Sequence, residues 1–190
     1  MKITSVDNTN RLFLVEDVLQ LDLVDKILHQ DWINLPWNDQ DGQEMWLRRS
    51  INFSNNPLLQ QATQELKNTY RQVEEACGIT VANADYINTS WWVDEPTFFV
   101  PIHTDGHLPA TMQLFWHANN ETLGTKFYNS KSRTDIRYDF PFRPNSGYVM
   151  LNGLNPDGSQ PLQWHGLLNK VPENSYRLTS YTIFNEYLVR

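Results

Sequence analysis

The sequence predicts a mainly β domain in which N-terminal helices cover one face of a sandwich or barrel. The first observation is a change of pattern: from about residue 81, six short runs rich in β-branched and aromatic residues alternate with Pro, Gly, Asn and Asp clusters. The second is that the preceding segment contains two stretches with helical periodicity. The length of 190 residues suits one domain. We therefore expect a single domain over 1–190, with a helical support region at 1–80 and a β core at 81–190.

The first helical pattern is VEDVLQLDLVDKILHQD, residues 15–31, in which Asp17 or Asp22 is the expected cap. Its predicted apolar face consists of Val18, Leu21, Val24, Ile27 and Leu28. The second pattern covers residues 56–78, where Pro57 near the start and Gly78 after the end are typical helix boundaries. Residues 35–53 between the two patterns indicate a loop that leads into a short strand.

The predicted β core begins with ADYINTSWWV and ends with RLTSYTIF. The runs between them are ATMQLFWHA, TKFYN, GYVMLN and LQWHGL. Six to eight short strands within about 110 residues are typical of a sandwich or barrel.

Composition narrows the expected partners and compartment. The net charge of −7 argues against a protein that grips nucleic acid through a basic surface. The single cysteine, Cys77, allows no internal disulfide and suits a reducing compartment. No apolar leader or membrane-length apolar run is present in the sequence. We expect a cytoplasmic protein that acts on a small molecule or a peptide; the sequence does not predict its oligomeric state.

Three of the five histidines lie in the segment PIHTDGHLPATMQLFWH, residues 101–117. Side chains two apart on a strand share a face, so His103 and Asp105 are expected to present ligand atoms to one point. His165, in a later strand-like run, is the candidate third ligand. Two histidines and one carboxylate form the facial triad that binds Fe(II) and leaves positions open. A His-x-Asp pair alone is a weak signal, and His165 alone also fits a hydrogen-bonded structural histidine.

A candidate anion receptor follows the triad. Arg177 lies 12 residues after His165, a spacing that accommodates one strand, a turn and the start of the next strand. Arg177 and Thr179 are expected to share a face. A guanidinium can donate two parallel hydrogen bonds to a carboxylate, so together with the triad Arg177 becomes the candidate anchor for an acidic cosubstrate.

In this order and spacing, the motifs His103-Thr104-Asp105, His165 and Arg177-Leu178-Thr179 resemble those of the Fe(II)/2-oxoglutarate-dependent dioxygenases, in particular the prolyl-4-hydroxylase-like branch. The resemblance covers roughly residues 85–188. It implies a double-stranded β-helix, or jelly roll, with His103, Asp105 and His165 holding Fe(II). It further implies that 2-oxoglutarate chelates the iron and meets Arg177 and Thr179 with its far carboxylate, that O₂ takes the last position, and that the substrate is hydroxylated.

The sequence departs from this family in places. Thr125 stands where the second of two glycines is expected, and His107 follows Asp105 by two residues. His107 is open to four interpretations: an exposed loop residue, a partner of the metal ligands, a substrate contact, or a ligand in a cupin-like site. The alternative function is accordingly a cupin-like metal-binding jelly roll, an isomerase or a sensor. Arg177 favours the oxygenase, because a cupin needs no carboxylate anchor.

Further predictions concern the residues around the site. If Met112, Leu114 and Trp116 face the helices, Gln113 and His117 point into the barrel, where Gln113 is a candidate donor to the cosubstrate. One residue of the pair Trp91 and Trp92 is expected to face inward, and Trp164 to face away from the metal. The polar segment 129–142, which contains Arg133 and Arg137, is either a lid over the site or a solvated loop.

Overall fold

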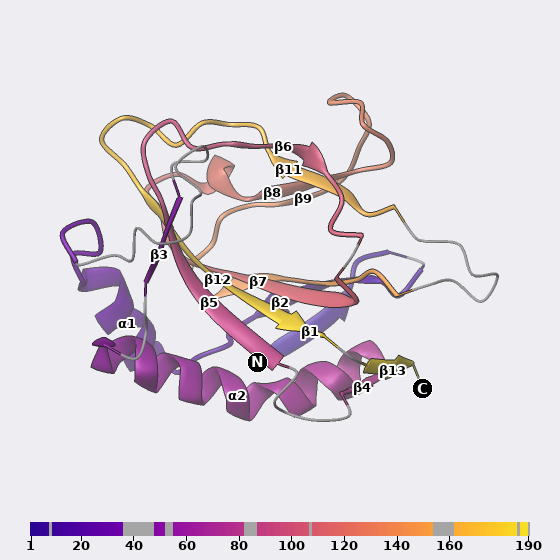
Figure 1. Cartoon of the computed structure of the whole chain (residues 1–190), viewed down its shortest axis with the longest axis horizontal. Helices are drawn as coiled ribbons and strands as arrows, with labels where there is room; N and C mark the ends of the chain where they lie inside the picture. The colour runs from indigo at the N-terminus through magenta and orange to yellow at the C-terminus, as the bar shows by residue number, and fades with distance from the viewer. Residues whose placement is uncertain are drawn as a thin grey trace.

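In the computed structural model, two antiparallel sheets face each other and two helices cover the outer side of the larger one (Figure 1). The structure describes residues 1–7, 9–35, 48–51, 55–81, 87–106, 108–153, 162–185 and 187–189. The larger sheet contains, in spatial order, β1 (Lys2–Ser5), β2 (Leu12–Glu16), β10 (Ser146–Leu151), β7 (Ala110–His117), β12 (Arg177–Phe184), β5 (Ile87–Asp94) and β3 (Arg48–Ile51).

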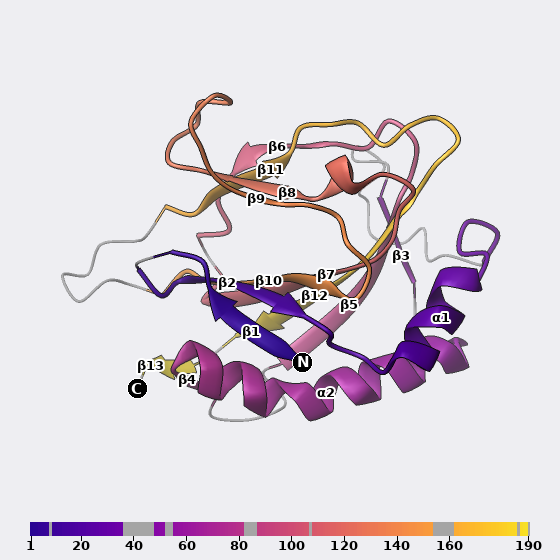
Figure 2. The same ribbon diagram turned by 180° about the vertical axis from the view of Figure 1, so that it is seen from behind.

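The smaller sheet contains, in spatial order, β6 (Val100–His103), β11 (Trp164–Leu167), β8 (Thr125–Tyr128) and β9 (Ile136–Phe140). A separate pair is formed by β13 (Tyr187–Val189) and β4 (Ile79–Val81). The chain passes from the larger sheet to the smaller one between β7 and β8 through a short 3₁₀ helix, Glu121–Leu123. Figure 2, the view from behind, shows the smaller sheet lying over the larger one and the helices below it.

The second helix begins and ends where the sequence predicts. α2 spans Pro57–Cys77; the Asn56 side chain accepts a hydrogen bond from the backbone N–H of Leu59, which caps the first turn. Gly78 ends the helix with φ 66°, a left-handed conformation that glycine adopts without steric cost. No helix in the described part of the chain is long and apolar enough to cross a membrane.

The prediction for the first helix was partly wrong. α1 spans only Leu21–His29, and its N-cap is Gln20, without a side-chain cap, instead of Asp17 or Asp22. Leu21, expected on the apolar face, is 78% exposed. The residues just before the helix form β2, which lies between β1 and β10. Leu12 packs toward the smaller sheet, whereas Phe13 and Val15 pack toward the helices. Both faces of this strand are therefore apolar, and the sequence lacks the alternation of apolar and polar residues by which strands are recognised.

Two apolar clusters lie on opposite faces of the larger sheet. One joins α1 and α2 to the outer face, and the predicted set Met112, Leu114 and Trp116 is part of it. The other, which includes Phe115 and Phe127, lies between the two sheets. The phase predicted for β7 is therefore confirmed, as is the prediction of a mainly β fold with N-terminal helices on one sheet.

The segment 129–142 is neither a separate lid nor only a loop. It contains β9, which pairs with β8 at the edge of the smaller sheet. Arg137, within β9, donates a hydrogen bond to the side chain of Gln163 and lies 5.9 Å from the centre of the Phe127 ring. The short strand expected within 35–53 is β3, whereas the expected loop before it, residues 36–47, and residues 52–53 lie outside the described residues.

Candidate metal centre

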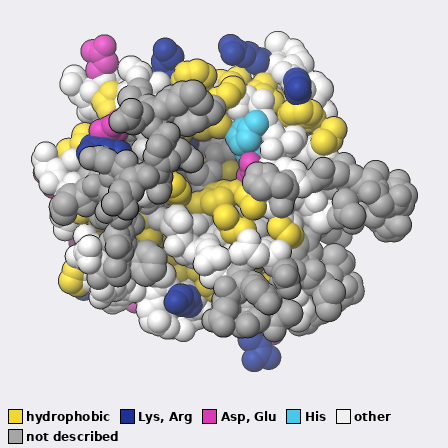
Figure 3. All heavy atoms as spheres, viewed as in Figure 1, with side chains coloured by type: hydrophobic (Ala, Val, Ile, Leu, Met, Phe, Trp, Pro, Cys, Tyr) yellow, Lys and Arg dark blue, Asp and Glu magenta, His cyan; other side chains and the backbone are white. Residues whose placement is uncertain are grey.

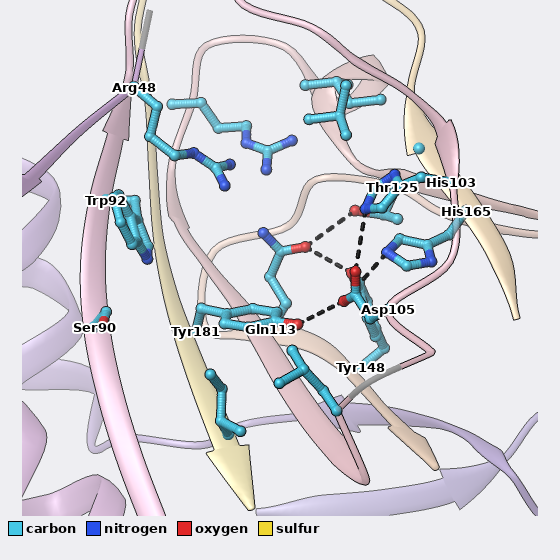
Figure 4. A pocket seen from close by; sticks show the side chains of 16 residues that line it. Arg48, Ser90, Trp92, His103, Asp105, Gln113, Thr125, Tyr148, His165 and Tyr181 are labelled. Atoms are coloured by element: carbon cyan, nitrogen blue, oxygen red, sulfur yellow. Dashed lines mark hydrogen bonds and ion pairs between the residues drawn. The ribbon is translucent and has the colours of Figure 1, made fainter. Parts of the chain in front are cut away.

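His103, Asp105 and His165 meet at one point between the sheets (Figure 4). His103 and His165 are directly paired across β6 and β11, and their ring centres lie 4.4 Å apart. Asp105 lies just beyond the end of β6, with Oδ1 3.2 Å from Nε2 of His103 and Oδ2 3.6 Å from Nε2 of His165. Two ligands with bonds of about 2.1 Å at a right angle are about 3 Å apart, so this donor set fits a divalent transition metal.

Backbone carbonyls fix the orientation of both imidazoles. Nδ1 of His103 lies 2.9 Å from the carbonyl oxygen of Pro101, and Nδ1 of His165 lies 2.8 Å from that of Gln163. Because a carbonyl oxygen only accepts, each Nδ1 carries the proton and each Nε2 presents its lone pair to the shared point. This is the outer hydrogen bond by which metal-binding histidines are commonly positioned.

The electrostatics of the triad favour the metal-binding protonation state at Asp105 and His165 and oppose it at His103. Burial tends to raise the pKa of Asp105, but the His103 hydrogen bond, the neighbouring His165 and the Tyr181 hydrogen bond hold it well below its usual range. Burial lowers the pKa of His165, which favours the neutral imidazole. For His103, burial is outweighed by contacts with Asp105 and the Pro101 carbonyl, so its pKa is raised. At this one ligand, metal binding therefore competes with protonation of the imidazole.

The triad forms one wall of a pocket of about 310 Å³ between the sheets. The surface view shows a histidine beside an acidic side chain at the edge of a hollow whose floor is largely apolar (Figure 3). His103 is the more accessible ligand, with its side chain 40% exposed, whereas that of His165 is 7% exposed. The remaining described lining residues are Arg48, Ser90, Trp92, Val100, Leu108, Gln113, Thr125, Tyr148, Gly166, Leu167, Arg177, Tyr181 and Ile183. This volume is at the lower end of the range of small-molecule sites.

Arg177 lies in the pocket wall, as the sequence predicts, but it already has an internal partner. It is 1% exposed, and its Nε lies 2.8 Å from Oδ2 of the fully buried Asp94. Nη1 donates to the carbonyl oxygen of Leu123 at 3.0 Å. Burial lowers the pKa of Arg177 and the Asp94 carboxylate opposes this; since arginine starts far above neutrality, the guanidinium stays charged.

A second arginine shares the same carboxylate. Arg48 donates to Asp94 Oδ1 from Nε at 2.5 Å and to Oδ2 from Nη2 at 3.1 Å. Its side chain enters the pocket from β3, on the side opposite the metal ligands (Figure 4). Arg48 and Asp94 belong to no motif in the sequence, and only the sheet register shows that they lie beside Arg177.

Of the other predicted site residues, Gln113 lines the pocket, whereas Thr179 and His117 are not among the described lining residues. Gln113 lines the pocket as expected, where its side-chain carbonyl accepts hydrogen bonds from Tyr148 at 2.7 Å and Thr125 at 3.3 Å. Thr179 is completely buried, but it is not part of the pocket lining, and its hydroxyl has no partner among the described residues. His117, expected to point into the barrel, is not among the described pocket-lining residues; its ring stacks at 4.7 Å on Tyr176, which packs against the helix-side cluster. His107 lies outside the described residues.

The pocket lining shows which of the three tryptophans discussed above faces inward. Trp92 lines it, whereas Trp91 is buried among the residues that face the helices, so one member of the pair does face inward. Trp164 does not line the pocket in the described part of the chain, and Lys131 lies 5.0 Å from the centre of its ring. Tyr181, which was not predicted from the sequence, donates a 2.6 Å hydrogen bond to Oδ2 of Asp105. Its position four residues after Arg177, on the same strand face, was the available signal.

No family model matches this sequence, and no curated protein is similar enough in sequence to count as a match. Solved structures do match over nearly the whole chain. A prolyl-4-hydroxylase from Pseudomonas putida has a TM-score of 0.60 and 13% identity, with 92% of each chain covered. HygX from Streptomyces hygroscopicus, solved with nickel and 2-oxoglutarate bound, has a TM-score of 0.58 and 9% identity, covering 95% of this chain and 87% of that one.

A viral collagen prolyl hydroxylase from Paramecium bursaria Chlorella virus 1, in complex with 2-oxoglutarate, has a TM-score of 0.54 and 11% identity, covering 94% of this chain and 98% of that one. At such low identities the likeness concerns the fold. The resemblance predicted from the sequence is thereby confirmed at that level: the chain has the jelly-roll fold of prolyl-4-hydroxylase and related 2-oxoglutarate/Fe(II) oxygenases.

Proposed function

We propose that this protein is an Fe(II)- and 2-oxoglutarate-dependent oxygenase that hydroxylates a peptidyl residue or a small metabolite. The observation that carries the proposal is the pairing, within one pocket, of a His-Asp-His donor set with an arginine wall that bears net positive charge. The fold, shared with solved oxygenases, supports the same reading.

His103, Asp105 and His165 would hold the metal, because their Nε2 and carboxylate atoms already face one another. Arg177 would receive the far carboxylate of 2-oxoglutarate, since a charge-assisted bond from a buried guanidinium is strong and geometrically selective. Gln113, with Tyr148 and Thr125 bonded to its carbonyl, would keep its amide N–H groups oriented as donors in the pocket. The bound metal and cosubstrate would supply the oxidising chemistry, in which O₂ and 2-oxoglutarate are consumed and succinate, CO₂ and the hydroxylated substrate are formed.

The pocket wall explains why an acidic cosubstrate would be retained. A carboxylate that enters the pocket meets two guanidinium groups and one buried carboxylate, so the local charge before binding is +1. The apolar side chains of Val100, Leu167 and Ile183 in the pocket wall lower the local polarity, which strengthens the attraction relative to bulk solvent.

One observation favours the second candidate, a metal-binding jelly roll that does not use 2-oxoglutarate. Asp94 already occupies the arginine that would anchor the cosubstrate. In such a protein the triad would bind metal and the Arg48–Asp94–Arg177 set would only join three strands.

The test is to incubate the purified protein with Fe(II), ascorbate and 2-oxoglutarate, with a panel of peptides and metabolites, and to measure succinate. We expect succinate above the level of a protein-free control, and more of it with a cognate substrate. Failure to bind 2-oxoglutarate in the presence of Fe(II), measured calorimetrically under nitrogen, would exclude the oxygenase and leave the metal-binding alternative.

A further inference from the structure

Arg48, Asp94 and Arg177 form a single row across three neighbouring strands. Asp94 is the register partner of Arg177 in the β12–β5 pair and of Arg48 in the β5–β3 pair. Directly opposed residues on adjacent strands have their side chains within contact distance. The alignment of two arginines on either side of one buried aspartate is therefore built into the sheet and does not depend on a loop.

We propose that Arg48 and Arg177 act together as a two-arginine clamp for the far carboxylate of the cosubstrate, with Asp94 as the group that positions both. The inference rests on the proposed function, which it deepens by assigning a second arginine and its support to cosubstrate binding. Arg48 is the new element, because it comes from the edge strand β3 and belongs to none of the motifs in the sequence.

The hydrogen-bond donors of the two arginines support this assignment. Asp94 engages Nε and Nη2 of Arg48 and lies against Nε of Arg177, while Leu123 takes Nη1 of Arg177. Within the described residues, Nη1 of Arg48 and Nη2 of Arg177 have no hydrogen-bond partner. A guanidinium can donate five hydrogen bonds, so each arginine retains donors for a ligand carboxylate.

The charge of the row makes both arginines necessary. Arg177 and Asp94 alone form a neutral pair, which offers an anion hydrogen bonds but no net attraction. Arg48 raises the net charge of the row to +1, and one bound carboxylate brings it to zero. Burying a charge without such compensation is strongly unfavourable, so this balance suits the uptake of one carboxylate.

An aromatic side chain holds both cations in place. The centre of the Phe98 ring lies 4.6 Å from Cζ of Arg48 and 5.9 Å from Cζ of Arg177. The centre of the Trp92 ring also lies near Arg48, 5.5 Å from its Cζ. Guanidinium groups within about 6 Å of a ring centre are attracted to it, which limits the rotamers that Arg48 can adopt before the ligand arrives.

The clamp is tested by calorimetric titration of 2-oxoglutarate into Fe(II)-loaded protein under nitrogen. We expect Arg48→Gln to weaken binding about 10- to 100-fold, the loss typical of a hydrogen bond to a charged group. Arg48→Lys keeps the charge and should lose less. The double variant Arg48→Gln/Asp94→Asn restores a net charge of +1 on Arg177, so it should recover affinity relative to Arg48→Gln. Pyruvate, a 2-oxo acid without the far carboxylate, should bind all variants equally.

The matched control is Arg49→Gln. Arg49 is the next residue of the same strand. It forms an ion pair at 2.5 Å with Glu95, the residue that follows Asp94. It does not line the pocket in the described part of the chain. Any general weakening of β3 would appear in this variant as well, whereas the clamp predicts unchanged 2-oxoglutarate affinity.

The outcomes separate the clamp from the proposed function. Tight binding of 2-oxoglutarate to the wild type and equally tight binding to Arg48→Gln would refute the clamp and leave the oxygenase intact. Equal losses in Arg48→Gln and Arg48→Lys, without recovery in the double variant, would also refute it, because a purely structural role has that signature. If the wild type bound no 2-oxoglutarate, the proposed function would fail. In that case the clamp would be tested separately, by thermal stabilisation with millimolar succinate in the absence of metal. Stabilisation of the wild type that is lost in Arg48→Gln would support the clamp, and equal stabilisation of both would refute it.

Discussion

Replacing Tyr181 by phenylalanine removes one hydroxyl and leaves the ring that lines the pocket. The hydroxyl donates a 2.6 Å hydrogen bond to Oδ2 of Asp105, the carboxylate of the triad. Burial, followed by the neighbouring Asp105, raises the pKa of Tyr181 well above its usual value, so the phenol remains a donor at neutral and moderately alkaline pH. The variant therefore tests whether this contact holds the carboxylate in position for a metal.

Two estimates of the magnitude agree. Losing a hydrogen bond to a charged group costs about 1.5–3 kcal/mol. Removing a group that orients a metal ligand typically lowers metal affinity by about 10- to 100-fold, which corresponds to roughly 1.4–2.8 kcal/mol. Asp105 stays ionised at neutral pH in the variant, because His103 and His165 still stabilise its charge. We therefore expect Tyr181→Phe to bind the metal about 10- to 100-fold more weakly through loss of orientation.

The assay is calorimetric titration of the apoprotein with Fe(II) under nitrogen, or with Mn(II). Tyr148→Phe is the matched control: it removes the same atom from the same pocket, but its hydroxyl bonds to the neutral amide of Gln113 at 2.7 Å. Its metal affinity should stay within about threefold of the wild type. Equal affinities of the wild type and Tyr181→Phe, with native circular dichroism, would show that the contact does not support a metal ligand.

Four further outcomes are expected. Asp105→Ala should abolish stoichiometric metal binding while the thermal transition is kept, because no core volume is removed; metal retained at wild-type stoichiometry would contradict the ligand assignment. Gly147→Ala places a Cβ 2.0 Å from the backbone oxygen of Gln113, so we expect a loss of about 3 kcal/mol or more and a Tm lower by roughly 6–12 °C. Gly78→Ala, with φ 66° but no heavy atom within 4 Å, should cost only about 1–2 kcal/mol; equal Tm losses would refute this steric reasoning. Burial raises the pKa of Cys77 to about 12, so at pH 8 the thiol should react with a disulfide reagent only after denaturation, and rapid reaction of the native protein would refute the burial argument.

The sequence alone predicts the elements of this fold that depend on local contacts. The periodicity of residues 57–77, with Pro57 at one end and Gly78 at the other, determines α2 almost to the residue. The phase of β7 follows from the alternation of Met112, Leu114 and Trp116 with Thr111, Gln113, Phe115 and His117, of which only Phe115 is apolar. These features are readable because each depends on contacts within a few residues or on a single buried face.

The three residues of the triad were predicted from the sequence, but the argument that His103 and Asp105 share one face of a strand was wrong. β6 ends at His103, so Asp105 does not share a strand face with it. The turn after β6, closed by a hydrogen bond from Leu108 N–H to the Asp105 carbonyl oxygen, brings the carboxylate toward both imidazoles. Tyr181, from the opposite sheet, holds it there. The residue types came from the sequence, and their convergence came from the packing of two sheets.

The row of Arg48, Asp94 and Arg177 shows what only the tertiary structure decided. These residues are separated by 46 positions on one side and 83 on the other, and each by itself has the appearance of an ordinary charged residue at a strand end. The register of β12, β5 and β3 sets them side by side and removes them from water, so that the charge of one depends on the other two. The sequence determines which charged groups are present. Pairing between strands that are far apart in the chain determines that two arginines share one buried aspartate in the wall of the pocket.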